Sequence, residues 1–272
     1  MFCKAVVYFL VALPSFPQTQ TFITIAIKHV PSTDRRDGRI EVRPNGDLFA
    51  RAVPVAQLLR YAYDLPTNPS ERISTLAEWT SSEKYDVEAK ASVDAIPSSL
   101  QDAEVSARIR QMVRGLLADR FGLVMRVENR TTSVYALTIS SEGPRFQRAA
   151  VTERDCLAAA GQEGCHNFVG GLGHPLNARA VDMDDLVRYI ENWTDLPVVN
   201  HTALRGLFTL NSQGWIPMRL PPPPPGAAPT GNPFEGIPTI FTVLGKLGLD
   251  LKRQEDTVPF YTVERIQRPP GN

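Results

Sequence analysis

Two cysteines and the two histidines that follow them are the first residues whose types and spacing could do chemistry. Cys156, Cys165, His166 and His174 give the pattern C-x8-C-H-x7-H. Structural zinc sites use more closely spaced ligand pairs than this pattern offers. An even pair of cysteines around a short flexible stretch is instead typical of a disulfide in an oxidising compartment. We therefore predict a disulfide between Cys156 and Cys165, no metal ligand and no cofactor.

Three aspartates form an acidic cluster at 182, 184 and 185, and two interpretations are open for them. Oxygen ligands of this kind could bind calcium, but an EF-hand needs further ligands and a glycine at fixed positions, which are absent here. Asp182 also stands where a helix N-cap is expected, and Asp185 follows three residues later. The spacing favours a helix cap.

Four charged residues could form a pocket for an anion. Asp119 and Arg120 end a long helical pattern, and Arg51 and Arg179 occupy equivalent places in two similar segments. The alternative is structural, with Arg120 near the last carbonyls of its helix and the other two arginines on the polar faces of strands. The structural interpretation is favoured.

No motif of a known catalytic site is present. The chain has no G-x-S-x-G, and Gly171-Leu172-Gly173 lacks the third glycine of a dinucleotide loop. The histidines have no suitably spaced acid or nucleophile: His29, His166, His174 and His201. We interpret Trp79 and Trp193 as core or rim aromatics. The sequence thus predicts no catalytic residue, although a triad assembled from distant positions stays an alternative.

The charge balance excludes one class of partner. The chain of 272 residues carries 29 Lys and Arg against 29 Asp and Glu, and nucleic-acid binders usually show a basic excess. Hydrophobic residues make up 43% of the chain and charged residues 21%, values typical of a folded globular protein. We predict no nucleic-acid partner.

The first residues resemble a secretory signal peptide. Lys4 precedes an apolar run at 5–13, which Pro14 and Pro17 then interrupt. A membrane-spanning helix needs about 20 apolar residues, so this run is too short to be one. The alternative is a buried strand or helix. We expect a signal peptide at 1–19, a periplasmic or secreted protein, and no integral membrane span in the mature chain.

Two segments of the chain are similar to each other. Residues 48–61 and 176–189 agree at eight of fourteen positions, including Ala-Arg-Ala-Val and Leu-x-Arg-Tyr. Both segments predict a helix with one apolar stripe: Val55, Leu58, Leu59 and Ala62 in the first, and Met183, Leu186, Val187 and Ile190 in the second. These similarities predict an internal duplication.

A second similarity joins the ends of the two halves. Residues 122–128 resemble 248–254, and residues 134–139 resemble 260–266. Their alternating apolar residues predict a closing hairpin in each half. Ahead of the first half, 22–28 alternates as an extra strand with Ile23, Ile25 and Ile27 pointing inward.

The fold class that follows is α+β. We expect two tandem strand–helix–strand–helix–strand–strand modules, with the helices packed on one face of each antiparallel or mixed sheet. The expected boundaries are a first module at 20–141, a linker with the cysteine pair at 142–174, and a second module at 175–272. A proline-rich insertion at 216–238 interrupts the second module and is either a surface loop or a docking segment.

Several motifs resemble a large soil-associated family of exported bacterial proteins of unknown function. The run from Trp79 to Ala91 resembles the family pattern W-x5-Y-D-[IV]-E-A-K-A. Other matches are L-L-A-D-R-F, V-Y-A-L and a P-V-V followed by T-x-L-x-G. The matching positions are Trp79, Tyr85, Asp86, Leu116, Leu117, Asp119, Arg120, Phe121, Tyr135 and Gly206. The family often has Asp where this chain has Asn200.

The resemblance implies a location outside the cytoplasm, and it implies no established activity. Duplication, export and the lack of catalytic motifs together predict a non-catalytic binding or sensing module. Its partner would be an unknown protein or small ligand outside the cytoplasm. Two alternatives are a hydrolase without recognised motifs and a structural component of the envelope. A histidine and a carboxylate that converge in a pocket would favour the hydrolase.

Overall fold

The computed structural model describes residues 22–66, 72–100, 102–158, 164–216, 218 and 236–270. The signal peptide expected at 1–19 and most of the proline-rich segment expected at 216–238 therefore lie outside the described residues. The fold is a mixed α+β structure with three four-stranded sheets and six helices in the described part.

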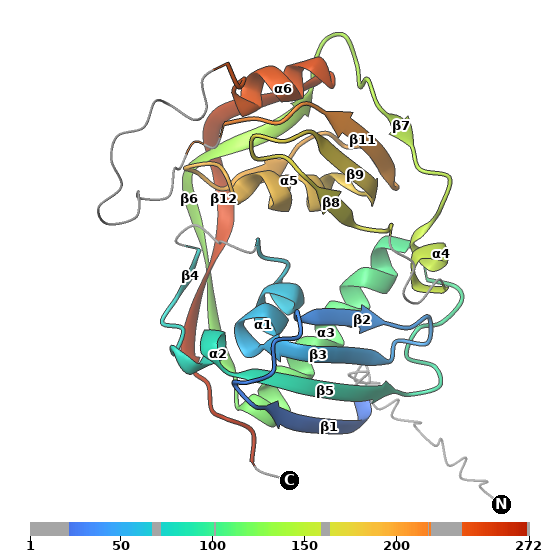
Figure 1. Ribbon diagram of the computed structural model, residues 1–272, viewed down its shortest axis with the longest axis vertical. Coiled ribbons are helices and arrows are strands. Elements are labelled where there is room, and N and C mark those ends of the chain that lie inside the picture. The colour runs from blue at the N-terminus through green and yellow to red at the C-terminus, as the bar shows by residue number, and fades with distance from the viewer. Residues whose placement is uncertain are drawn as a thin grey trace, which may run out of the picture.

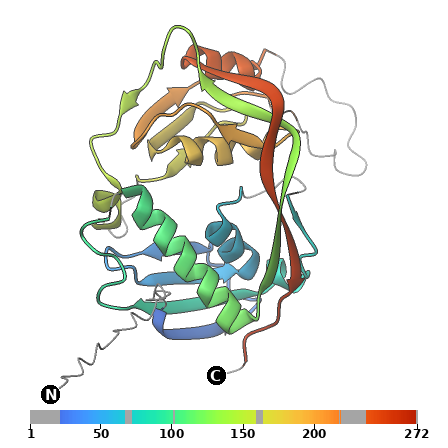
Figure 2. The ribbon, with the colours of Figure 1, turned by 180° about the vertical axis from the view of Figure 1, so that it is seen from behind.

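The first sheet is antiparallel and has the strand order β1-β5-β3-β2 (Figure 1). Its strands are β1 (Phe22–Val30), β2 (Arg39–Val42), β3 (Leu48–Pro54) and β5 (Lys84–Ala91). The helices of this half are α1 (Val55–Tyr63), the short α2 (Trp79–Ser82) and the long α3 (Asp102–Phe121), which crosses the sheet in Figure 2. The apolar stripe predicted for α1 is confirmed, because Val55, Leu58, Leu59 and Ala62 are all buried.

A second antiparallel sheet has the order β7-β11-β9-β8. Its strands are β7 (Gln147–Arg148), β8 (Asn167–Val169), β9 (Leu176–Val181) and β11 (Phe208–Ser212). The helices of this half are α4 (Glu153–Ala158), α5 (Met183–Glu191) and α6 (Ile240–Lys246). The stripe predicted for α5 is also buried. The segment expected as a linker at 142–174 supplies β7, α4 and β8.

A third sheet joins the two halves along one side of the molecule (Figures 1 and 2). Its order is β10-β6-β12-β4, and its strands are β4 (Ile73–Ser74), β6 (Val124–Ile139), β10 (Val198–Asn200) and β12 (Leu249–Arg265). The expected hairpins are wrong, because each segment is one continuous strand that pairs with the other half. The polar run at 129–133 resembles a turn in sequence, but it continues β6 and pairs with 255–259 of β12.

The N-terminal strand differs from the expected pattern at one residue. Ile25 and Ile27 pack against the core as predicted, whereas Ile23 is 68% exposed. The register of β1 against β5 shifts between Phe22 and Thr24, and this irregularity turns Ile23 outward while Phe22 is buried. Among the described residues, no helix is long and apolar enough to cross a membrane.

Candidate functional site

A cavity of about 630 Å³ lies between the two halves. The first half lines it with β2, the C-terminal end of α1 and one face of α3. The second half lines it with α4, the start of β8 and α5. Pockets between structural units are common ligand sites in proteins. We therefore take this cavity as the candidate functional site.

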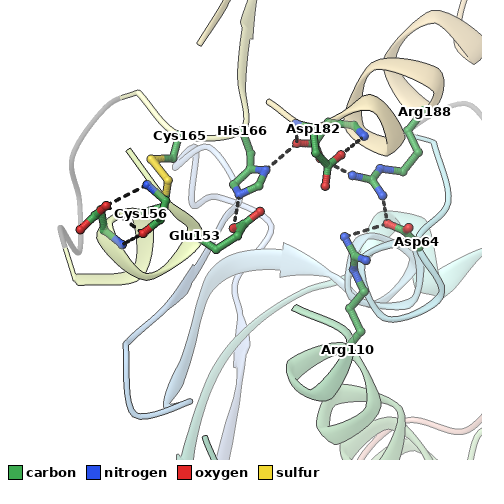
Figure 3. A network of polar contacts seen from close by, with 11 residues as sticks. Asp64, Arg110, Glu153, Cys156, Cys165, His166, Asp182 and Arg188 are labelled. Atoms are coloured by element: carbon green, nitrogen blue, oxygen red, sulfur yellow. Dashed lines mark hydrogen bonds and ion pairs between the residues drawn. A yellow bond between two sulfur atoms is a disulfide. The ribbon is translucent and has the colours of Figure 1, made fainter. Parts of the chain in front are cut away.

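A chain of charged side chains crosses the cavity wall from one half to the other (Figure 3). His166 lies 2.8 Å from Glu153 through Nε2 and 2.5 Å from Asp185 through Nδ1. Arg188 bonds both Asp185 and Asp64, which belong to different halves. Arg110 on α3 completes the chain with a contact of 3.0 Å to Asp64. Charge pairing thus links α4, α5, α1 and α3.

A local sequence rule, the capping of α5, places Asp185, one carboxylate of this network. Asp182 is the N-cap of α5, where its side chain accepts the Asp185 N–H at 2.6 Å, and Asp185 accepts the Asp182 N–H in return. The capping box expected from the acidic cluster is therefore confirmed. The Asp185 carboxylate is shared, because it also meets His166 and Arg188. The third aspartate, Asp184, accepts a hydrogen bond from Asn200.

The disulfide brings His166 to this position. Cys156 on α4 and Cys165 are joined, with their Cα atoms 5.6 Å apart, as the spacing of the cysteines predicts. The bond ties α4, which carries Glu153, to the residue directly before His166. The bond also occupies the two sulfur atoms that the metal interpretation required. His166 itself has left-handed backbone geometry, with φ at 49°.

The charges around His166 control the proton affinities of the network. Burial by itself lowers the pKa of His166, but the hydrogen bonds to Asp185 and Glu153 outweigh it and raise that pKa to about 10. Burial by itself raises the pKa of Asp185, but His166 and Arg188 lower it to about 2. For Asp182, burial and the nearby Asp185 charge raise the pKa to about 6.

The convergence of a histidine and carboxylates in a pocket is the observation that the hydrolase alternative needs. The protonation state of His166, however, favours a structural role. Both ring nitrogens of His166 face a carboxylate oxygen, so the favoured form is an imidazolium that donates from both nitrogens. An imidazolium whose pKa is near 10 is a poor general base at neutral pH. The geometry favours a positioning role, in which His166 holds α4 against α5.

This arrangement predicts a pH-dependent contribution of His166 to stability. A pKa raised above the usual 6.5 stabilises the folded protein fully below about pH 6.5, and the contribution is lost as the pH approaches 10. We expect His166→Gln to lower the free energy of unfolding by about 1 kcal/mol at pH 6.5, a small value because solvent partly screens the ring. At pH 9.5 the loss should be much smaller, because the imidazolium is then close to its pKa. Urea unfolding across this pH range measures the effect. The exposed His174→Gln is the matched control, and equal pH profiles for both variants would contradict the prediction.

The other charged residues singled out in the sequence lie outside the cavity wall. Asp119 and Arg120 are exposed at the end of α3. Arg51 pairs with Glu88 on the neighbouring strand at 3.4 Å, and Arg179 donates to Asn177 at 3.1 Å. The two strand arginines therefore lie on polar strand faces, as the structural interpretation expects.

Most residues of the family motifs have structural roles. Tyr85 packs edge-on against Phe121 and donates to Glu83 at 2.9 Å, and burial raises its pKa to about 12. Asp86 accepts the N–H of Ala52 at 2.7 Å, which stabilises the left-handed geometry of that residue, with φ at 50°. Leu116 and Leu117 belong to the core of the first half.

Three further motif positions, and Trp193 outside the motifs, also pack or turn the chain. Tyr135 belongs to the second core and lies edge-on to the exposed Phe241. Trp79 and Trp193 are partly buried at the rims of the two cores. Gly206 has φ at 89° in the turn before β11, a conformation that favours glycine.

Asn200, where the family often has Asp, closes a turn. Its Oδ1 accepts from the Thr202 amide at 3.0 Å and from the Thr202 hydroxyl at 2.8 Å, while its amide donates to Asp184. An aspartate could accept in the turn but could not donate to Asp184. Asparagine therefore suits this turn.

Sequence reasoning missed Asp64, Arg110 and Glu153, which hold the network together. They belong to three different helical regions, and nothing in their local patterns links them. The two similar segments differ at one informative position. Asp185 aligns with Gln57 of the first half, so the two copies of the Leu-x-Arg-Tyr motif differ in charge three residues before the arginine.

One family model matches most of the chain. It is described as "Protein of unknown function (DUF3738)" and covers residues 56–266. The match runs from α1 to the end of β12, so it includes the described helices and the cavity lining except β2. Neither a curated protein nor a solved structure matches this chain.

Proposed function

We propose that this chain, which belongs to the DUF3738 family of proteins of unknown function, is a non-catalytic module that binds a small ligand between its two halves. The cavity of about 630 Å³ carries the proposal, because its size suits a metabolite and both halves line it. A ligand held there would contact elements of both halves at once. Ligand binding at such a site could change how the two halves are presented to a partner protein, which suits a sensing role.

We further propose that the two halves are tandem copies of one module. The strand orders β1-β5-β3-β2 and β7-β11-β9-β8 support this, since equivalent strands occupy equivalent places. Ala52 and Ala180, equivalent in the repeat, are both left-handed, with φ at 50° and 45°. Thr131 and Thr257, which are equivalent at the offset of the second similarity, pair with each other where β6 lies against β12. Their hydroxyl oxygens lie 3.1 Å apart. A pseudo-twofold axis through this pair would relate the copies.

The proposed compartment is outside the cytoplasm. The disulfide between Cys156 and Cys165 fits an oxidising environment, where such bonds form and persist. The apolar run at 5–13, which resembles a signal peptide, supports the same compartment. A ligand would then be met in the periplasm or outside the cell.

Filling the cavity tests the proposal. Ser106 on α3 lines the cavity, whereas the neighbouring Ala107 is exposed and does not. We expect wild-type protein and Ala107→Trp, incubated with a metabolite extract and passed through a desalting column, to retain the same small molecule. Ser106→Trp should retain at least about tenfold less, because the indole occupies the space. Mass spectrometry of the protein fraction measures retention.

Two results would contradict this function. The wild-type protein could retain no compound above the level of an unrelated control protein. Alternatively, Ser106→Trp could retain as much as Ala107→Trp while both remain folded by circular dichroism.

A further inference from the structure

Arg60 is a cation without a counterion in the described part of the chain. It lies near the C-terminal end of α1 and lines the cavity between the halves. Every other charged residue of that lining has an opposite charge within 4.0 Å. Arg60 has none among the described residues, and its buried Nε lacks a hydrogen-bond partner there. Burial without a compensating charge lowers the pKa of this guanidinium.

The second half shows what such an arginine binds when a carboxylate is available. Arg188 occupies the place in α5 that Arg60 occupies in α1, within the same Leu-x-Arg-Tyr motif. Asp185, three residues earlier, bonds Arg188. At the equivalent place in α1 the chain has the neutral Gln57. The first half therefore keeps the arginine and lacks its carboxylate.

The surroundings of Arg60 define the rest of a ligand. A second hollow of about 520 Å³ shares Arg60, Tyr61, Ile40 and Leu65 with the cavity, so Arg60 lies where the two spaces meet. The second hollow adds the apolar Pro54 and Ala56 and the polar Gln57 and Ser81, and the two shared residues Ile40 and Leu65 are apolar. A charged group bound at Arg60 would thus have apolar walls beside it.

We infer that Arg60 binds the carboxylate of a small organic acid whose apolar body lies in the adjoining hollows. The carboxylate would take the role toward Arg60 that Asp185 has toward Arg188, through charge-assisted hydrogen bonds. This inference rests on the proposed function and adds the chemical class of the ligand. Gln57 determines specificity here, because its neutral side chain leaves the arginine available.

A pair of substitutions on α1 tests the inference. Hexanoate, octanoate and 4-phenylbutyrate, each beside its neutral amide, are titrated into wild-type protein by ligand-observed NMR, and inorganic phosphate is titrated separately. We expect at least one acid to bind at least about tenfold more tightly than its amide. Arg60→Gln should remove this preference. Gln57→Asp should remove it too, by supplying an internal carboxylate, whereas the neutral Gln57→Asn should keep it.

The outcomes separate this inference from the proposed function. Equal affinity for acids and amides, a preference that survives either Arg60→Gln or Gln57→Asp, or no binding of any acid would overturn the inference. Phosphate binding alone, without the acids, would also overturn it, since the apolar walls would then have no role. The Ser106→Trp retention experiment does not depend on these probes, so the binding function stands or falls separately. Thermal midpoints near the wild-type value confirm that each variant is folded.

Discussion

Replacing Glu191 with leucine is expected to lower the free energy of unfolding by about 3 to 5 kcal/mol. Glu191 ends α5 in the second half and holds Arg72 of the first half through two hydrogen bonds of 3.0 and 2.8 Å. The two side chains are only 1% and 10% exposed. The substitution leaves a buried guanidinium without its counterion and also removes the acceptor of the Val198 N–H. Urea unfolding followed by far-ultraviolet circular dichroism measures the loss.

Two further variants show that charge burial causes this loss. The double variant Arg72→Met/Glu191→Leu should be more stable than Glu191→Leu alone, because an apolar pair removes the uncompensated charge. The matched control is Arg51→Met, which breaks the exposed pair with Glu88 and should change stability by less than about 0.5 kcal/mol. A loss for Glu191→Leu no larger than that of Arg51→Met would refute the argument.

Sequence periodicity predicted α1 and α5 because the burial pattern of these helices is local. The stripes of α1 and α5 repeat every three or four residues, and each helix buries that stripe against its own sheet. The long strands β6 and β12 could not be predicted in the same way. In β6 the residues from Glu128 to Thr131 are polar and exposed, and Thr132 and Ser133 are polar and half-buried, so the local pattern resembles a turn. Only pairing with a segment more than a hundred residues away makes them one strand.

In the candidate site, too, contacts between residues close in sequence could be predicted, whereas contacts between distant residues could not. The disulfide and the Asp182 cap depend on residues close in sequence, and both could be predicted from spacing. The ion pairs of Asp64 with Arg110 and Arg188 depend on how three helices meet, which no local pattern encodes. The charge difference between Gln57 and Asp185 was visible in the repeat, but its meaning required the structure to show which carboxylate Arg188 uses.

Removing the disulfide is expected to give the second large effect. The double variant Cys156→Ser/Cys165→Ser should lose about 2 to 3 kcal/mol of unfolding free energy, because the bond closes a short loop and restricts the unfolded chain. Adding a thiol reductant should lower the unfolding midpoint of wild-type protein similarly and leave the double variant unchanged. The unreduced protein should also be two hydrogens lighter than the reduced protein by mass spectrometry. A wild-type midpoint insensitive to reductant would contradict the prediction.

The disulfide and the charge network should also be energetically coupled. Cys165 directly precedes His166, and Cys156 shares α4 with Glu153, so the bond holds the histidine beside its carboxylate. Without the bond, α4 can move away from β8, and the ion pair of His166 with Glu153 then stabilises the folded protein less. His166→Gln should therefore cost less at pH 6.5 in the double serine variant than in wild-type protein, by about 0.5 kcal/mol or more. Additive effects in this cycle would show that the bond stabilises the chain without positioning His166.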